Sequence, residues 1–262
     1  MKINFLSFTI HIIEGYISSL YLVEYDDGML LLDGGCVNDV KRIEDYCKLV
    51  LNRSPSDIKL AVVSHMHPDH AGGAVALRKK YGIAIAAHKD VDLWYSGVGG
   101  SLQHKLDCYM ALSVARRTQR GWGRMLFKPV IHPDYLFSDL QVLPFFNDWA
   151  ILHTPGHTLH DIVLYQQQES LLYIGDVICE VKGKMLLPLP VMFPAQMENS
   201  YNKLATLNPS TILLAHGGVK HTQNASSLFL DMKEQLHQPP NSLTRRVYRL
   251  SGFSPEIKRQ GM

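Results

Sequence analysis

Short apolar runs and longer amphipathic stretches alternate along the first third of the chain. The apolar runs are rich in β-branched and aromatic residues and are bounded by turn-forming residues, a pattern typical of strands. The longer stretches repeat apolar residues at the spacing of a helix face. Asp26, Asp27 and Gly28 predict a hairpin turn, and Asn38 is a candidate helix cap. We therefore expect strands at 3–12, 18–25, 29–32, 60–63 and 83–87, and helices at 39–51 and 71–81.

The rest of the chain shows the same mixture of patterns. A helix at 106–117 is expected within a long stretch, 92–139, that separates the two β-rich halves. Asn208 and Pro209 predict the end of another helix, because the residue before a proline disfavours helical backbone. The periodicity therefore indicates a mixed α/β fold. We expect strands at 149–153, 162–165, 171–174 and 211–215, and helices at 196–207 and 221–237.

Residues 65–70, with the sequence His-Met-His-Pro-Asp-His, directly follow the predicted strand 60–63. They supply three imidazoles and a carboxylate, which are good ligands for a divalent cation. Pro68 stiffens this loop, and Gly72 and Gly73 leave room for close approach of the backbone. We interpret the loop as metal-binding rather than as a histidine-rich surface loop.

Three further candidate ligands follow predicted strands. His157 lies in the Thr-Pro-Gly-His-Thr stretch after strand 149–153, Asp176 comes just after strand 171–174, and His216 follows strand 211–215. Sites in α/β folds are built where strands end at one edge of a sheet. We therefore expect these side chains to lie close to the metal-binding loop.

This arrangement resembles the metallo-β-lactamase superfamily, whose pattern is H-x-H-x-D-H followed by a distant His, Asp and His. The likeness runs from about Asp33 to His216. It implies an αββα sandwich, with two mixed sheets flanked by helices. The sequence adds a helical insertion between the second and third metal motifs. We expect residues 1–262 to form one such domain, with the insertion at about 92–139 and a helical C-terminal tail at about 239–262.

The resemblance also implies two metal ions with a water or hydroxide between them. Asp69 is implied to orient this hydroxide as the catalytic residue, and His157, rather than His153, is implied as a ligand. Asp33 is implied to support the metal ligands without binding a metal itself. The alternative is that Asp33 only forms an ordinary turn with the glycine that follows it. The implied ligands are His65, His67 and His157 for the first ion, Asp69, His70 and His216 for the second, and Asp176 bridging both.

The donor count supports the same conclusion from the residues themselves. Five imidazoles and two carboxylates are too many for one four-coordinate zinc, but they suit a pair of ions. A single-metal site that uses part of this set remains the alternative. We expect two divalent ions, Zn²⁺ first, with Mn²⁺ or iron also compatible with imidazole and carboxylate ligands.

A hydroxide held by two cations is a strong nucleophile. We therefore expect a binuclear metal-dependent hydrolase that uses a metal-bridging hydroxide on a small ester, thioester or lactone. Asp176 makes the chain similar to the glyoxalase II and lactonase relatives rather than the true β-lactamases, but Cys179 stands where the lactonases carry tyrosine. The alternatives are a mononuclear-iron enzyme like the persulfide dioxygenases, a phosphodiesterase, or a non-catalytic sensor that retains the fold.

The composition of the chain limits the binding partners and the cellular location that we expect. A net charge of +2 does not favour nucleic acid, so a small-molecule substrate is expected, and a homodimer is left open. The four cysteines have no Cys-x-x-Cys spacing and are interpreted as reduced thiols of a cytoplasmic protein. The apolar start, 1–13, is interpreted as a strand rather than a signal peptide, and no apolar run reaches the roughly 18 residues of a membrane span.

Residues 96–128 carry a net charge of +5, with six cationic side chains against Asp107 alone. One interpretation is a lid that contacts an anionic substrate. The other is a solvated basic face whose aromatic underside packs on the core. The aromatic residues in and beside this stretch are Trp94, Tyr95, Tyr109, Trp122 and Phe127.

Overall fold

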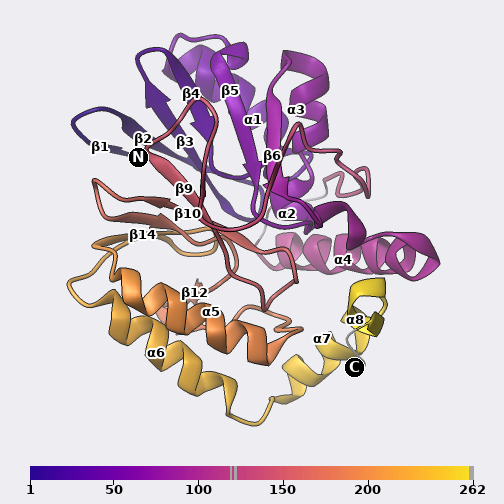
Figure 1. Cartoon of the computed structure of the whole chain (residues 1–262). Coiled ribbons are helices and arrows are strands. Elements are labelled where there is room, and N and C mark those ends of the chain that lie inside the picture. Colours follow the sequence, from indigo (N-terminus) through magenta and orange to yellow (C-terminus); the bar gives the residue numbers. More distant parts are fainter. Residues whose placement is uncertain (119, 121–122, 260–262) are drawn as a thin grey trace.

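The structure, a computed structural model, describes residues 1–118, 120 and 123–259. Two β-sheets pack face to face, with helices on both outer sides (Figure 1). Buried residues from both sheets, among them Leu30, Val62, Ile151 and Leu164, form one hydrophobic cluster between them. This apolar layer holds the two halves of the chain together.

The first sheet has seven strands in sequence order. The first four form an antiparallel meander, and the later pairs are parallel. Residues 26 and 27 form the tight turn between the third and fourth strands, as predicted. The strands are β1 (Lys2–Asn4), β2 (Thr9–Glu14), β3 (Ser19–Tyr25), β4 (Gly28–Leu31), β5 (Ile58–Val63), β6 (Ala84–His88) and β7 (Tyr135–Phe137).

The second sheet has the strand order β15-β14-β11-β10-β9-β8, in which only the β11–β14 pair is parallel. A separate two-stranded hairpin follows β11. The strands of the sheet are β8 (Gln141–Val142), β9 (Trp149–His153), β10 (Ile162–Gln166), β11 (Leu171–Tyr173), β14 (Thr211–Leu214) and β15 (Gly218–His221), and those of the hairpin are β12 (Cys179–Val181) and β13 (Lys184–Leu186).

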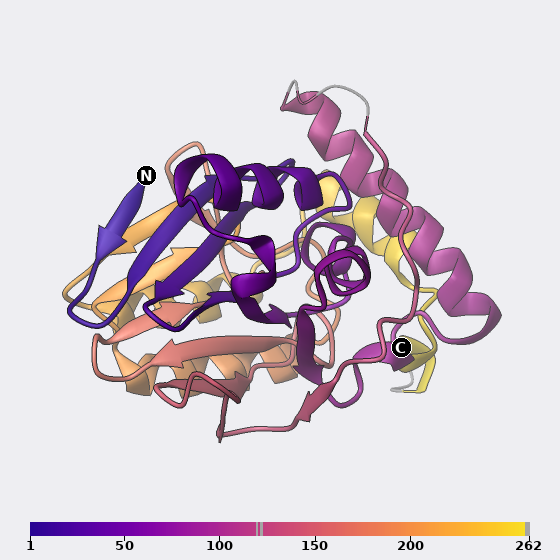
Figure 2. The ribbon, with the colours of Figure 1, turned by 90° about the horizontal axis from the view of Figure 1, so that it is seen from above.

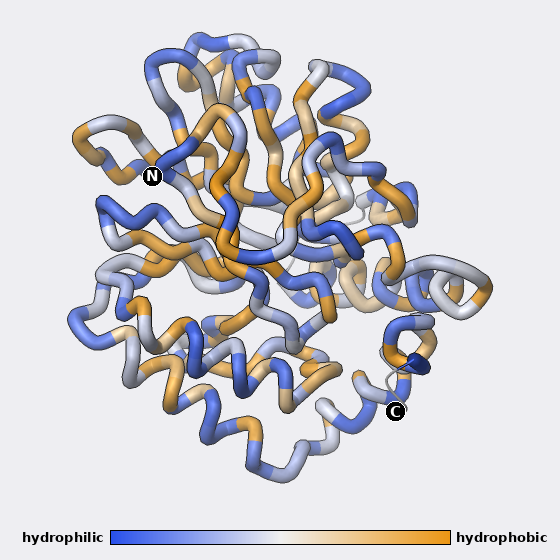
Figure 3. Tube along the Cα trace, viewed as in Figure 1, coloured by the Kyte–Doolittle hydropathy of each residue, from blue (hydrophilic) through white to orange (hydrophobic). Residues whose placement is uncertain are grey.

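Helices cover both outer faces of the sandwich. Ile43 of α1 (Asp39–Asp45) and Leu77 of α3 (Ala74–Tyr81) pack on the first sheet, while α5 (Pro194–Leu207) and α6 (Ala225–Leu236) pack on the second. Figure 3 shows that apolar residues concentrate along the strands, whereas the helices alternate in hydropathy. The predicted αββα sandwich is therefore confirmed. Outside these layers lie α2 (Pro68–Ala71), α4 (Gly97–Arg117), α7 (Ser242–Ser251) and α8 (Pro255–Arg259).

Some predicted boundaries in the first half are wrong. The expected strand 3–12 is two strands, because the chain reverses where the Phe5 amide donates to the Phe8 carbonyl and Phe8 enters the core. The expected helix 71–81 breaks at Gly72 and Gly73. There the Gly73 amide donates to the Gly35 carbonyl, and a Cβ on Gly73 would lie 2.4 Å from the Gly34 oxygen. This close contact replaces the helical hydrogen bonding.

The cap and the second-half boundaries also differ from expectation. Asn38 occupies the cap position of α1, but its side chain makes no cap hydrogen bond and instead accepts one from the Arg124 amide. Helix α4 begins at Gly97, nine residues before the predicted start at 106. The expected helix 221–237 begins only at Ala225, because His221 belongs to β15 and pairs there with Thr211 of β14. The short strands β7, β8, β12 and β13 were not predicted, since two or three residues carry too little pattern.

Helix α4 and the C-terminal helices lie together beside the sandwich (Figure 2). Helix α4 contacts both α7 and α8, as well as α2 in the metal-binding loop. Among the described residues, none of the helices is long and apolar enough to cross a membrane.

Candidate metal centre

The candidate ligands converge at one edge of the sandwich. The loop that carries His65, His67, Asp69 and His70 directly follows β5 and contains the short helix α2. The other three candidate ligands come from the second half, in the β9–β10 loop and just after β11 and β14. Ligand atoms of all seven candidates fall into two adjacent groups, His65, His67, His157 and Asp176 in one, and Asp69, His70 and His216 in the other.

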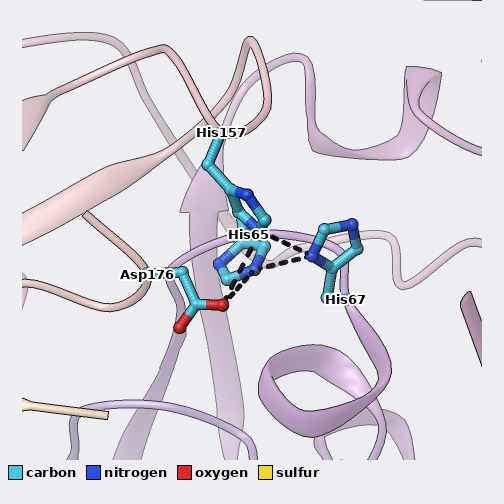
Figure 4. A group of neighbouring side chains, drawn as sticks. All are labelled: His65, His67, His157 and Asp176. Carbon is cyan, nitrogen blue, oxygen red and sulfur yellow. Dashed lines mark hydrogen bonds and ion pairs between the residues drawn. The ribbon is translucent and has the colours of Figure 1, made fainter. Parts of the chain in front are cut away.

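The first group surrounds a common point (Figure 4). The His67 Nδ1 atom lies 3.1 Å from His65 Nε2 and 2.8 Å from His157 Nε2. The Asp176 Oδ2 atom lies 3.9 Å from His65 Nε2 and 3.6 Å from His157 Nε2. Three imidazole nitrogens and one carboxylate oxygen therefore face one another, and four donors of these types suit a tetrahedral zinc site.

The second group lies on the other side of Asp176. Its Oδ1 atom is 3.2 Å from His70 Nε2 and 3.3 Å from His216 Nε2. The Asp69 Oδ2 atom lies 3.2 Å from the same His216 nitrogen. One oxygen of Asp176 thus faces each group, as a bridging carboxylate requires.

The donor spacing fits metal ions. Ligands bound at about 2 Å in a tetrahedron lie roughly 3.3 Å apart, and the distances in and between the two groups range from 2.8 to 3.9 Å around this value. Two of the inward atoms, His70 Nε2 and Asp176 Oδ1, are buried without a hydrogen-bond partner. Buried polar atoms are normally satisfied, so these two atoms indicate a missing positive partner.

Burial and neighbouring charges set the protonation of the two groups. Burial lowers the pKa of His67 and of His157 to about 4, so both imidazoles are neutral at pH 7 and have a lone pair to donate. Burial also lowers the pKa of His70, but the carboxylates of Asp176, Asp33 and Asp69 outweigh it and raise the pKa. The carboxylates around the second group therefore favour positive charge at this position, which suits a site for a cation.

The outward nitrogens of the histidines are held by fixed acceptors. Asp33 Oδ2 accepts from the Tyr173 hydroxyl at 2.7 Å and lies 2.6 Å from His70 Nδ1. Asp33 therefore orients His70, as the resemblance implied, and Tyr173 is a strand residue that holds Asp33. His157 Nδ1 lies 2.5 Å from the Pro190 carbonyl, to which it donates. Such partners fix the tautomer, which leaves the other nitrogen free to bind a metal.

His153 and His160 lie outside the two groups. The His153 ring stacks on His88 with centroids 4.3 Å apart, and its Nε2 lies 2.8 Å from the Leu159 carbonyl. His160 is fully buried. It accepts a hydrogen bond from the Met66 amide inside the metal-binding loop.

Sequence reasoning missed Asp107 on α4. Its Oδ2 atom lies 3.7 Å from His67 Nε2, on the side of the ring opposite the metal group. Burial raises the pKa of Asp107 to about 6, so it is mostly ionised at pH 7. The sequence feature that could have pointed to this residue is its charge, because Asp107 is the single acidic residue among the six cationic residues of 96–128.

Two aromatic residues just before the basic stretch 96–128 pack at the site. Trp94 and Tyr95 are buried, and the Trp94 ring meets the edge of His67 at 6.1 Å between centroids. Arg117 is exposed, and Arg120 pairs with Glu14 on the surface. Trp122, an aromatic residue within this stretch, lies outside the described residues.

His216 is the most accessible of the candidate ligands. Its side chain is 23% exposed and those of His67, Asp69 and Asp176 are 12% exposed, whereas His65, His70 and His157 are almost fully buried. A substrate can therefore reach the centre from the side of His216.

Comparison with protein families gives one clear match. A model described as the metallo-beta-lactamase superfamily matches residues 13–216, which is more than half of the chain. Solved structures agree on the fold. An archaeal metallo-beta-lactamase superfamily protein from Sulfolobus tokodaii superposes with a TM-score of 0.63 at 16% identity, covering 95% of this chain and 96% of that one. A metallo-beta-lactamase from Pontibacter korlensis gives 0.61 at 16% identity, with 91% and 99% covered.

The curated relatives are named as hydrolases. The chain is 25% identical over 184 residues to the acyl-coenzyme A thioesterase MBLAC2 of Gallus gallus, covering 68% of this chain but only 62% of that protein. It is 27% identical over 201 residues to the hydroxyacylglutathione hydrolase GloC of Haemophilus influenzae, covering 74% and 82%. A hydroxyacylglutathione hydrolase of Bartonella quintana is 39% identical over 88 residues, about a third of each chain.

Proposed function

Because the chain belongs to the metallo-beta-lactamase superfamily, we propose that it is a binuclear metal-dependent hydrolase of a small thioester, ester or lactone. The observation that carries this proposal is Asp176, which turns one carboxylate oxygen to each group of donors. Thioesters come first among the substrates, since both acyl-coenzyme A and hydroxyacylglutathione, named in the relatives, contain that bond.

The candidate ligands would be shared between two metal ions. His65, His67 and His157 would hold the first ion, Asp69, His70 and His216 the second, and Asp176 would hold both. When bound, two divalent ions lower the pKa of a shared water and polarise the substrate carbonyl. Zn²⁺ is the proposed metal, since nitrogen and carboxylate donors in tetrahedral sets suit it.

Asp69 is the proposed catalytic residue. Its Oδ2 atom lies 3.2 Å from His216 Nε2 and faces the accessible side of the centre. A carboxylate there can accept a hydrogen bond from the attacking water and receive its proton. The buried histidines of the first group would hold their positions and exclude water from that side.

The substrate is proposed to be anionic. Support comes from the net charge of +5 in residues 96–128 and from exposed Arg117 on α4. Arginine can hold a carboxylate or phosphate through paired hydrogen bonds. We further propose that residues 1–262 form one domain, and that the protein works in the cytoplasm, where its four unpaired cysteines would stay reduced.

Metal analysis combined with a substrate panel tests the proposal. Purified protein should contain about two metal equivalents and should hydrolyse at least one member of a panel of acyl thioesters, carboxylic esters, lactones and phosphodiesters. Asp176→Ala should lose at least one equivalent and lower kcat/KM by about 100-fold or more, while its circular dichroism stays that of a folded protein.

Two results would contradict the proposal. One is wild-type protein that holds no metal and gains no activity from added zinc, manganese or iron. The other is an Asp176→Ala variant with both metal equivalents and normal turnover. Phosphodiester cleavage alone, or oxygen consumption with a persulfide and one iron per chain, would favour the alternatives instead.

A further inference from the structure

The geometry of His67 differs from that of the other histidines in its group. Its Nδ1 atom faces His65 Nε2 and His157 Nε2, so its Nε2 atom points outward. His65 and His157 do the reverse and turn Nδ1 outward, to the Ser64 hydroxyl and the Pro190 carbonyl respectively. A neutral imidazole that donates its Nδ1 lone pair to a metal must carry its proton on Nε2. The outward proton of His67 therefore needs an acceptor of its own.

Asp107 is the carboxylate that faces this nitrogen. Its Oδ2 atom lies 3.7 Å from His67 Nε2, which is within ion-pair range but longer than a direct hydrogen bond, and its side chain is only 5% exposed. Two donors hold the carboxylate in place, the Tyr95 hydroxyl at 2.8 Å and the Gln103 side-chain amide at 2.7 Å. A carboxylate buried and held in this way is not a solvated surface charge.

The C-terminal helices hold Asp107 through Gln103. The Gln103 amide nitrogen also donates to the Leu250 carbonyl at 3.1 Å, and its oxygen accepts from the Phe253 amide at 3.0 Å. A second set of contacts links the C-terminal segment to the metal-binding loop. Glu256 lies 3.6 Å from His160, which accepts from the Met66 amide between His65 and His67.

We propose that Asp107 is a positioning residue for His67, and that α4 and the C-terminal segment 242–259 act through it to set the geometry and affinity of the first metal position. The inference rests on the proposed metal centre and deepens it. Carboxylate partners of metal-bound histidines fix the ring and raise its basicity, and their loss typically weakens metal binding by about 10- to 100-fold. The first metal position would then depend on α4 and on the C-terminal segment, neither of which contributes a ligand.

The test compares Asp107→Asn with wild type in the full-length protein. The asparagine keeps the shape of the side chain but removes its charge. Stepwise zinc dissociation constants, measured against a competing chelator, should show the first site weakened by about 10- to 100-fold and the second nearly unchanged. The visible spectrum of the cobalt-substituted variant should change as well, since it reports ligand geometry and not stability.

Two more variants separate positioning from folding. Gln103→Leu keeps Asp107 but releases it from the C-terminal segment, so it should give a smaller loss at the same site. Lys105→Ala, at an exposed position on the same helix, should bind zinc like wild type. Thermal melting of the metal-free proteins provides the check on folding.

Each outcome either supports or overturns the proposed role of Asp107. A metal-free Asp107→Asn protein that melts like wild type but binds the first zinc weakly, with an altered cobalt spectrum, supports the role of Asp107. Wild-type zinc affinity and cobalt spectrum in that variant overturn it and leave the binuclear proposal standing. A wild-type protein that binds no metal overturns both.

Discussion

At the scale of single residues, the first group of donors depends on which of two nearby histidines reaches it. His153 and His157 are four residues apart, but His153 pairs with Ile162 at the end of β9, while His157 follows the turn at Gly156. A Cβ on Gly156 would lie 2.4 Å from Met197 Cβ, so only glycine allows the turn to pack against α5. This turn brings the ring of His157 to His65 and His67.

Alanine variants of the two histidines should therefore behave differently. His157→Ala should lose metal from the first group and most activity, because it removes one of three imidazoles. His153→Ala should keep its metal and change kcat/KM by less than about 3-fold, since it loses only a stacked ring and one hydrogen bond to a carbonyl. Metal content and steady-state kinetics provide the measurement, and the opposite pattern would show that His153 is the ligand.

At the scale of elements, α4 shows how tertiary contact can override local preference. Its first turn contains Gly97, Gly99 and Gly100, which disfavour helix, and the sequence therefore predicted a start at 106. A Cβ on Gly100 would lie 2.2 Å from the Tyr95 carbonyl carbon, and one on Gly99 would lie 2.4 Å from the Phe253 oxygen. The glycines let the start of α4 pack closely against Tyr95 and the C-terminal segment.

Substitution of these glycines should thus destabilise the protein although alanine favours helix. Gly100→Ala should lower the free energy of unfolding by about 1–3 kcal/mol through overpacking against the backbone. Gly252→Ala provides the control, because nothing lies within 4 Å of its Cβ position and its φ is negative. It should raise stability by about 0.4–1 kcal/mol. Urea unfolding of the metal-free proteins measures both, and equal effects would contradict the packing argument.

At the scale of the whole molecule, the C-terminal segment packs against α4 and beside His160, outside the two sheets. Glu256 of α8 is buried there beside His160, with Asp90 as a further negative neighbour and Arg259 as a positive one. Burial, together with Asp90, raises the pKa of Glu256 from 4.5 to about 7. The ionised carboxylate is therefore disfavoured in the folded protein.

This shift predicts a pH-dependent effect of Glu256→Gln. A carboxyl with a raised folded-state pKa contributes stability below its unfolded pKa, near 4.5, and loses that contribution as pH rises to about 7. Glutamine does not ionise, so the variant should gain about 2 kcal/mol on wild type between pH 4.5 and pH 8, allowing for partial solvent screening. Urea unfolding of the metal-free proteins at both pH values measures this gain, and a constant difference would contradict the shift.

From periodicity, the sequence by itself determined a mixed α/β class, and the likeness of its motifs to the metallo-β-lactamase superfamily implied the αββα sandwich and the set of ligands. Each candidate ligand stands just after an apolar run, and strand ends at one sheet edge build sites, so residue type and position also predicted that these side chains would converge. His65, His70 and His216 needed no long-range information beyond that rule. Residue type also showed that the donors suit metal ions.

Only the tertiary structure decided what surrounds those donors. Asp107 meets His67, and Glu256 meets His160, across 40 and 96 residues of chain respectively. Neither contact leaves a periodic signal, because a helix places side chains in a repeating pattern but does not select its neighbour. The break at Gly72 and the early start of α4 likewise follow from backbone approach by distant segments. Local pattern specifies elements, whereas the packing between elements selects the partners of each ligand.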